Sequence, residues 1–398
     1  MSTTVMLTAV LLIAVPDPGA EGPQNWAWQD VDIYNASLDR SFNANVYYPG
    51  ISQGQNQPLD PALAPYSSVV FGHGFAMNRN RYDFLGRHLA SHGYVVVLMN
   101  FKDLDNGNQR SDMSASITWI GEQNADPSSW LFGQLDTDHI GVSGHSMGGG
   151  VSIQVAGEDE RVHGCAPLAP ATEATDVARV TGPLLILAGD RDGLTPIEGI
   201  RGAYEAAVAP SGLLTIFGGN HNQFMDVSFP WEDVFDGNPD ISRAEQHRLT
   251  NLYTTAHFGY YHKRIAEYRT HLYGYRVGAD PGVDIDSESG EVLDVILAPV
   301  STEVEPGESV QVAITVRNNT GSELELQGRT WVRRDGLTLI DPAAGPIQFA
   351  VRSQDSRGRP ITQGVPPGTE PVTVDYGVTI EIPYRNPVED SFPLTVTP

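Results

Sequence analysis

The stretch Gly144–Gly148 reads GHSMG, a G-x-S-x-G pattern with Ser146 at its centre. A short apolar run at residues 139–142 precedes it, and a helix-compatible segment at residues 151–156 follows. A serine in so sharp a turn has a strained backbone and an exposed hydroxyl. The flanking positions must be glycine, because a Cβ there would collide with the neighbouring strand or helix. The alternative is a glycine-rich turn without chemistry, but the strand–turn–helix context favours a nucleophile elbow at Ser146. The backbone N–H of Met147 would then face a developing oxyanion.

Two apolar runs downstream, residues 183–189 and 213–217, predict buried parallel strands. Acidic residues follow the first run, and His221 follows the second. Catalytic groups gather beyond the carboxyl ends of such strands, and the chain order serine, acid, histidine is typical of one hydrolase architecture. We therefore expect His221 to act as the base that takes the proton of Ser146.

Two acids compete for the third position, Asp190 and Asp192. Asp192 is preferred because it lies in the loop proper, where Gly193 and Pro196 shape the turn. Asp190 is closer to the strand and is expected to bond loop amides or an arginine.

A second oxyanion donor is predicted after the strand at residues 67–71. This strand ends in Gly72–Ala76, which reads GHGFA, and the backbone N–H of Phe75 is the expected donor. His73 and His145 lie within glycine turns, and we interpret both as packing and hydrogen-bonding residues instead of catalytic acids or bases.

Three segments together resemble a known group: FGHGF at residues 71–75, LASHGYVVV at 89–97 and GHSMGG at 144–149. They are similar to the α/β-hydrolase branch of bacterial cutinase-type polyester hydrolases. Platelet-activating-factor acetylhydrolases, chlorophyllases and dienelactone hydrolases are relatives of that branch. The resemblance covers about residues 30–275, and it implies a doubly wound, mostly parallel sheet.

The resemblance also implies site residues. It identifies Ser146, Asp192 and His221 as a triad, with Phe75 and Met147 as oxyanion donors. In the polyester hydrolases an aromatic residue at the oxyanion position and a tryptophan after the sixth strand form a clamp around the substrate. Phe75 supplies the first ring here, whereas Ala171 stands where the tryptophan is expected. This departure bears on polyester binding and not on ester hydrolysis.

An aromatic segment follows His221 and is a candidate lid or acyl-pocket wall. Phe224 and Trp231 are the substrate-binding residues that we predict there, together with Phe75. The alternative is that the aromatic side chains of this segment only pin the loop to the body of the protein. The sequence leaves both interpretations open.

The composition excludes several classes of protein. The chain has 398 residues, with 24 Lys and Arg against 49 Asp and Glu, and a formal net charge of -25. There is no basic patch, so nucleic acid is excluded as a partner. Cys165 is the only cysteine and reads as a buried, inert thiol. The loop at residues 103–108 imitates part of a calcium loop without the distal Glu, and a solvated turn is favoured. We predict no cofactor and no metal, and a monomer.

Changes in composition and hydrophobic pattern along the chain suggest its domain organisation. Residues 1–20 contain an apolar run of signal-peptide length that is too short for a membrane span, and a secretory signal peptide is favoured there over a first strand of the fold. Residues 21–277 form the expected α/β-hydrolase domain, 278–290 a polar linker, and 291–398 an immunoglobulin-like β-sandwich with alternating strands.

These observations predict a secreted or cell-surface serine ester hydrolase that forms an acyl-enzyme on Ser146. Its substrates would be esters, polymeric or lipid-like among them. Two alternatives stay open: an acyltransferase with the same triad, and an adhesion or binding protein in which the sandwich carries the function.

Overall fold

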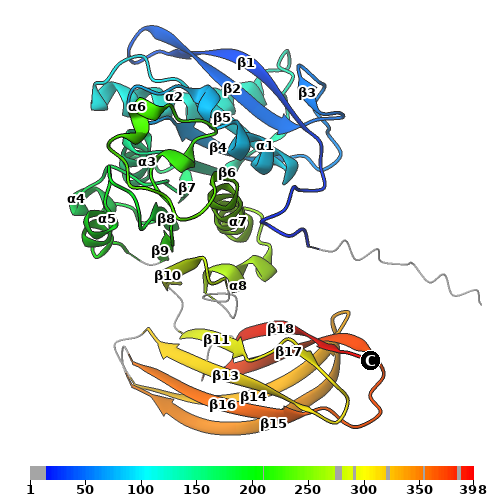
Figure 1. Cartoon of the computed structure of the whole chain (residues 1–398). Helices are drawn as coiled ribbons and strands as arrows, with labels where there is room; N and C mark the ends of the chain where they lie inside the picture. Colours follow the sequence, from blue (N-terminus) through cyan, green and yellow to red (C-terminus); the bar gives the residue numbers. More distant parts are fainter. Residues whose placement is uncertain are drawn as a thin grey trace, which may run out of the picture.

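A computed structural model describes residues 15–208, 210–273, 280–289, 293–319, 323–352, 355–382 and 387–398. The first part of the chain forms a ten-stranded sheet in the order β10-β9-β8-β7-β6-β4-β5-β2-β1-β3 (Figure 1). Its strands are β1 (Trp26–Asn35), β2 (Arg40–Pro49), β3 (Gly54–Gln55), β4 (Tyr66–Gly72), β5 (Tyr94–Met99), β6 (Leu135–Gly144), β7 (Val162–Cys165), β8 (Leu184–Gly189), β9 (Ser211–Ile216) and β10 (Val283–Glu288).

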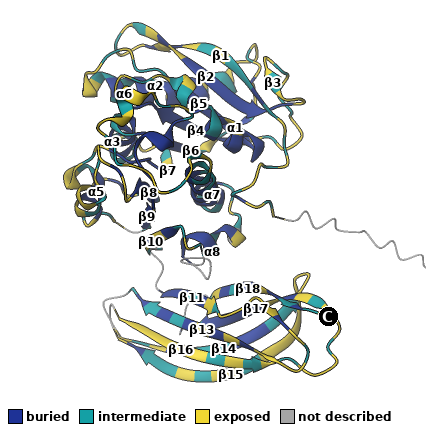
Figure 2. Cartoon of the chain, viewed as in Figure 1, coloured by how far each residue is buried: buried dark blue, intermediate teal, exposed yellow. Residues whose placement is uncertain are grey.

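The centre of this sheet is parallel, from β5 through β4, β6, β7 and β8 to β9, and antiparallel strands lie at both margins. The central strands are buried along their length because helices cover both faces of the sheet. Figure 2 shows this dark central layer. A parallel centre places the carboxyl ends of β4, β6, β8 and β9 at one edge, where the predicted site residues follow.

Two apolar cores lie on the two faces of the sheet. Met113, Ile117 and Val151 belong to one core, and Leu85, Leu89 and Leu249 to the other. The helices are α1 (Asp83–Ser91), α2 (Asn106–Ala125), α3 (Met147–Glu158), α4 (Ala174–Val177), α5 (Ile197–Tyr204), α6 (Pro230–Asp233), α7 (Arg243–Tyr261) and α8 (Arg269–Leu272), with 3-10 turns η1 (Arg79–Arg81), η2 (Asn222–Phe224) and η3 (Ala266–Tyr268).

The C-terminal part consists of two sheets that share one core. One sheet has the order β11-β13-β16 and the other β12-β18-β17-β14-β15. This strand-rich region is consistent with the predicted β-sandwich. Its strands are β11 (Leu293–Pro299), β12 (Glu303–Val304), β13 (Ser309–Asn318), β14 (Leu324–Arg334), β15 (Leu337–Val351), β16 (Ser356–Gly364), β17 (Val372–Glu381) and β18 (Val388–Val396).

The connection between the two parts differs from the expected linker at residues 278–290. Within it, β10 pairs antiparallel with β9 and extends the first sheet. Val283 and Ile285 are buried, because alternate side chains of β10 face the helical layer. The polar, acidic composition concealed this strand, since its two apolar residues alternate with acids. Residues 278, 279 and 290 lie outside the described residues.

The N-terminal prediction is tested only in part, because residues 1–14 lie outside the described residues. Residues 15–25 run along the body of the first domain, where the Tyr268 hydroxyl donates to Pro16 O at 2.8 Å and His88 Nε2 lies 2.9 Å from Pro18 O. In the described part of the chain, no helix has the length and apolar character needed to span a bilayer.

Candidate active site

Ser146 stands at the junction of β6 and α3 in a conformation that side chains rarely adopt. Its φ is 56° and its ψ is -116°. Such a backbone costs on the order of 1–3 kcal/mol and persists only where the surroundings impose it. Here a Cβ on Gly148 would collide with the carbonyl oxygen of Gly72, and one on Gly144 with that of Gly148. Both glycines are therefore required by the tight packing of the turn against β4.

The segment after β7 holds the elbow from the other side. Ser146 N–H donates to Leu168 O at 2.9 Å, and Ser146 O accepts from Ala171 N–H at 2.9 Å. Ala171, the position where a tryptophan was expected, is exposed and thus contacts the elbow through its backbone.

Asp192 and His221 meet across the loops that follow β8 and β9. Asp192 Oδ2 lies 2.7 Å from His221 Nδ1, and both residues are buried. A carboxylate at Nδ1 holds that nitrogen as the N–H donor and leaves Nε2 as the basic nitrogen. Asp190 takes a different part: its Oδ1 accepts from Gly218 N–H at 2.6 Å, which joins the two loops.

Thr195 completes the surroundings of this carboxylate, and the sequence analysis did not identify it. Its hydroxyl lies 2.9 Å from Asp192 Oδ2 and 3.1 Å from His221 Nδ1, while its N–H donates to Asp192 Oδ1 at 2.7 Å. Leu194 N–H also donates to Oδ1, at 2.8 Å. Asp192 is thus held in one orientation by hydrogen bonds to both oxygens. Leu194 follows Asp192 by two residues, the spacing of an Asx turn, and this local pattern was the available signal.

Asp236 is a second residue that sequence reasoning missed. Its Oδ1 accepts from Gly193 N–H at 3.0 Å and from His221 N–H at 3.3 Å, and its Oδ2 accepts from Asn222 N–H at 2.8 Å. One carboxylate therefore connects the loop of Asp192 with the loop of His221. It comes from the segment after α6, and no local motif marks it.

The predicted oxyanion loop follows β4 and lies beside the elbow. A Cβ on Gly74 would sit 3.5 Å from Ser146 Cβ. Among the described residues, the backbone N–H groups of Phe75 and Met147 have no protein acceptor. Both are therefore available to a ligand oxygen near Ser146.

Tyr82 joins this loop to the elbow. Its hydroxyl accepts from Gly74 N–H at 3.0 Å and lies 3.0 Å from His145 Nδ1. Burial raises the pKa of the Tyr82 phenol and lowers that of His145 far below the usual value for histidine. The two groups are therefore neutral, and the Tyr82 hydroxyl can donate its single hydrogen to His145 Nδ1.

The two glycine-turn histidines are buried, as the packing interpretation requires. His73 Nε2 accepts from Phe101 N–H at 3.0 Å, and Nδ1 lies 2.7 Å from Gly74 O. Burial lowers the pKa of His73. The His145 ring packs 4.4 Å from the His221 ring, centroid to centroid, and so supports the histidine of the site.

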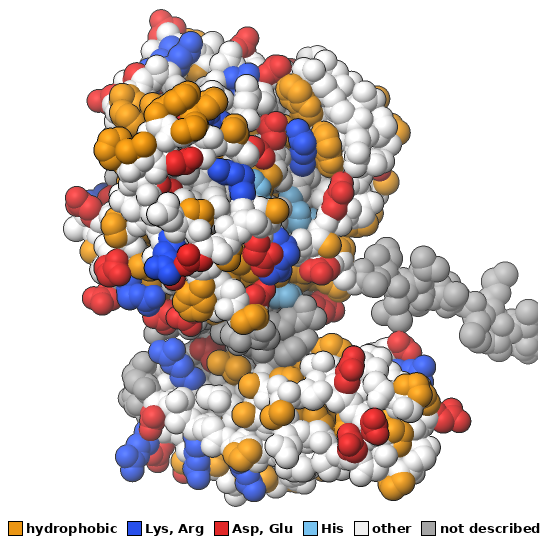
Figure 3. Space-filling view, in the orientation of Figure 1, with side chains coloured by type: hydrophobic (Ala, Val, Ile, Leu, Met, Phe, Trp, Pro, Cys, Tyr) orange, Lys and Arg blue, Asp and Glu red, His pale blue; other side chains and the backbone are white. Residues whose placement is uncertain are grey.

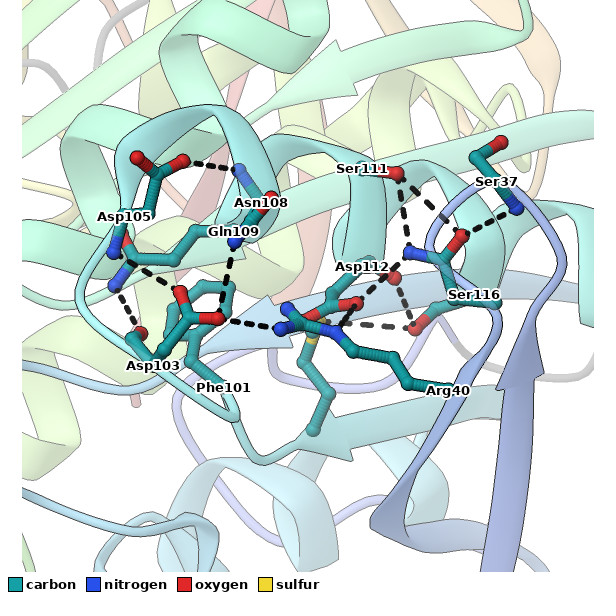
Figure 4. A network of polar contacts seen from close by, with 12 residues as sticks. Ser37, Arg40, Phe101, Asp103, Asp105, Asn108, Gln109, Ser111, Asp112 and Ser116 are labelled. Atoms are coloured by element: carbon teal, nitrogen blue, oxygen red, sulfur yellow. Dashed lines mark hydrogen bonds and ion pairs between the residues drawn. The ribbon is translucent and has the colours of Figure 1, made fainter.

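A polar network joins the start of β2 to the loop before α2 and to α2 itself (Figure 4). Arg40, at the start of β2, pairs with Asp112 of α2 and with Asp103. Gln109 Nε2 donates to Asp103 O at 2.9 Å and lies 3.3 Å from Met147 Sδ. The loop that imitates a calcium site is thus engaged by an arginine, and Asp105 caps α2 by accepting from Asn108 N–H at 2.9 Å. Within the described residues, no group of three or more His, Cys, Asp or Glu side chains is arranged to hold a metal ion.

The three predicted substrate-binding residues have different surroundings. Phe75 is 60% exposed and Trp231 is 66% exposed, so both rings are open to a ligand. Phe224 is completely buried and packs 5.9 Å from His145, so the prediction that it contacts substrate is wrong. It lies in η2 directly after His221, where the turn directs the ring into the core.

The aromatic segment after His221 therefore divides into two parts. Phe224 pins the loop, as the alternative interpretation expects. Phe229 and Trp231 stack at the surface with their ring centroids 4.6 Å apart. The guanidinium carbon of Arg81 lies 4.9 Å from the centroid of the Phe229 ring. Arg81 also forms a salt bridge with Glu232 at 2.8 Å. Phe235 is also exposed.

Comparison with known proteins shows what the first domain is similar to. Residues 43–208 match the model of the PETase family, described as PET hydrolase-like. The match contains Ser146 and Asp192 and ends before His221. The chain is 28% identical over 212 residues to a cutinase of Thermobifida fusca (strain YX), covering 49% of this chain and 66% of that protein.

Two further relatives agree. Cutinase est1 of Thermobifida alba is 28% identical over 135 residues, 33% of this chain and 45% of that protein. A bis(hydroxyethyl) terephthalate hydrolase of Streptomyces coelicolor is 26% identical over 178 residues, 44% of this chain and 52% of that protein. The chain thus spans from 45% to 66% of the length of these relatives. The matches confirm the resemblance to cutinase-type polyester hydrolases, and this family has the α/β-hydrolase fold.

Proposed function

We propose that this chain is a secreted serine carboxylic-ester hydrolase that acts on polyesters through an acyl-enzyme on Ser146. The observation that carries the proposal is the buried Asp192–His221 pair, whose imidazole packs 4.4 Å from the ring of His145, the residue directly before a serine with φ of 56°. A strained serine, a histidine oriented by a buried carboxylate and two unpaired backbone N–H groups form the set that acyl transfer requires. The similarity to cutinases and to a terephthalate-ester hydrolase supports the substrate class.

In this mechanism His221 Nε2 takes the proton of Ser146 as Oγ attacks the ester carbonyl carbon. The developing oxyanion accepts hydrogen bonds from the N–H groups of Phe75 and Met147. His221 then returns the proton to the alkoxide leaving group, and an acyl-enzyme remains. Water, deprotonated by the same histidine, attacks the acyl carbon, and the carboxylic acid leaves as Ser146 is restored.

Asp192 stabilises the positive charge that His221 acquires in each half-reaction. Its orientation by Thr195 and Leu194 fixes the imidazole before substrate arrives, so little reorganisation is needed in the transition state. Asp236 also helps to fix the imidazole of His221. Its carboxylate accepts hydrogen bonds from the backbone N–H groups of Gly193 and His221, and so holds the two loops at a constant separation.

The exposed rings of Phe75 and Trp231 are the proposed contacts for an apolar or aromatic polymer chain. Ala171 leaves the tryptophan position of the clamp empty, so we expect hydrolysis of small soluble esters to exceed that of aromatic polyesters. We further propose that residues 21–277 with β10 form the catalytic unit and that the C-terminal sandwich is immunoglobulin-like.

The decisive test is turnover of p-nitrophenyl esters of graded acyl length beside release of acid from an aliphatic and an aromatic polyester film. We expect hydrolysis in water to exceed ester formation when a primary alcohol is added. Product dominated by the new ester would identify an acyltransferase, and the absence of turnover with every ester would reject the hydrolase.

A further inference from the structure

A cavity of about 200 Å³ lies within the C-terminal sandwich, far along the chain from Ser146. It opens between the edge strands β15 and β16, whose residues are mostly exposed or half-buried (Figure 2). An apolar cavity of about 150 Å³ is enough to hold benzene. The space between the sheets therefore accommodates one ring or a short aliphatic chain.

Small residues on one sheet create the cavity. In the register of β14 and β15, Gly328 pairs with Ile347 and Thr330 pairs with Ala344. Directly paired residues share a face of the sheet, so this wall has little side-chain volume at its centre. A Cβ on Gly328 would sit 3.0 Å from Ile380 Cδ1, which shows that the glycine faces the same apolar interior.

The opposite wall carries two arginines. In the register of β13 and β16, Arg359 pairs with Ile314 and Arg357 with Val316. Ile314 and Val316 belong to the buried core of the sandwich. Arg357 and Arg359 therefore lie on the inner face of β16, where a sandwich normally places apolar side chains, and both line the cavity.

Among the described residues, no carboxylate neutralises either arginine. Arg329, on the other wall, pairs with Asp341 and Glu381. In the parts of the sandwich that are described, Arg357 and Arg359 have no carboxylate partner, and Arg357 Nη1 donates to Ala350 O at 3.1 Å. Both side chains are exposed at the mouth, and Figure 3 shows Lys and Arg side chains along the lower rim of this domain. On a chain of net charge -25, two unpaired cations at one apolar cavity are unusual.

We propose that this cavity binds a small organic carboxylate. The apolar body lies between Ile347, Ile361 and Ile380, and the carboxylate is held by Arg357 and Arg359. The guanidinium fork matches the two oxygens of a carboxylate. The site is separate from Ser146, so this inference does not rest on the proposed function. The carboxylate is either a free acid or the end of a polymer chain.

The first test is calorimetric titration of the full-length chain, carrying Ser146→Ala, with octanoate and with the neutral octanamide. Octanoate is expected to bind, and octanamide to bind at least about tenfold more weakly because it lacks the charge. Arg357→Gln with Arg359→Gln should weaken octanoate by a similar factor. Arg334→Gln is the matched control, because this arginine is exposed, lies outside the cavity and, among the described residues, pairs with Asp335 alone, at 3.7 Å.

Three results would overturn the proposal: no binding of octanoate, equal binding of octanamide, or unchanged affinity in the double variant. The melting temperature of each variant, measured in the same buffer, shows that the sandwich is folded. A second arm identifies the source of the carboxylate. Adsorption of the Ser146→Ala chain is compared on polycaprolactone films with free and with methyl-esterified chain ends. If the Ser146→Ala chain adsorbs less to the esterified film, and the double variant adsorbs equally little to the film with free ends, the ligand is the chain end. If the Ser146→Ala chain adsorbs equally to both films, the ligand is the free acid.

Discussion

The Asp192 carboxylate lies 2.7 Å from His221 Nδ1, and its side chain is completely buried. The two residues are 29 positions apart in the sequence. Thr195, Leu194 and Asp236 surround the pair with hydrogen bonds. A hydrogen-bonded pair so enclosed has few orientations open to it, and this rigidity is what a histidine base requires. Five expected outcomes follow from this site and the fold that supports it.

Replacing the nucleophile should abolish activity. Ser146→Ala is expected to lower turnover of p-nitrophenyl butyrate by on the order of 10⁶-fold, because the remaining groups cannot form the acyl-enzyme. An organophosphonate should label the parent chain and not this variant, as read by intact mass. Labelling of the variant at another serine would mean that the elbow is not the site.

The two candidate acids should separate clearly. Asp192→Asn is expected to lower kcat by roughly 10⁴-fold, since the amide disturbs the tautomer of His221. Asp190→Asn should lower it far less, because Asp190 only accepts from Gly218 N–H. Steady-state kinetics on both variants, with circular dichroism as the check on folding, make the comparison. If Asp190→Asn proves the more damaged enzyme, the assignment is reversed.

Asp226 should make stability depend on pH. Burial raises the pKa of Asp226 to about 6, above the value of about 3.9 for an unfolded aspartate. The folded state therefore binds the proton more tightly, and stability should fall as pH rises between these two values. Asp226→Asn is expected to raise the melting temperature at pH 7.5 by a few degrees and to leave it unchanged near pH 3.5. An equal effect at both pH values would contradict the pKa argument.

The ion pair between Arg40 and the buried Asp112 should matter for stability. Asp112 is fully buried and bonds Arg40 and Asn35. Asp112→Ala is expected to cost about 3–5 kcal/mol, because it leaves the guanidinium of Arg40 without its buried partner. Urea unfolding measures the difference. Asp138→Ala, at an exposed aspartate of β6, serves as the control and should change the free energy of unfolding by less than about 0.5 kcal/mol.

The boundary of the catalytic unit should lie after β10. A chain ending at Glu288 is expected to hydrolyse small soluble esters like the full-length protein. A chain ending at Gly278 also loses Val283 and Ile285 from the core, at about 1.5–3 kcal/mol for each fully buried side chain, and should melt at a lower temperature. Equal melting temperatures of the two shortened chains would show that β10 is dispensable. Loss of activity in the longer chain, while folded, would mean that the sandwich helps to build the site.

Local patterns predicted the parts of the site that depend on neighbours in the sequence. The elbow at Ser146 is such a part, because strand, turn and helix follow one another within a few residues. The choice of Asp192 followed from the same kind of reasoning. Phe224 shows the limit: proximity to His221 suggested a pocket wall, whereas a turn of η2 directs the ring into the core.

The sequence by itself determined which strands end in the polar site residues, where the elbow lies, and that the second domain consists of alternating strands. These features depend on short-range sterics and on periodicity. Tertiary structure alone decided the rest. Tyr82 meets His145 across 63 residues, and β10 pairs with β9 although a long helix separates them. The cavity between the sandwich sheets depends on two strand registers at once. Contacts of this kind arise from packing of distant segments, for which neighbouring residues carry no signal.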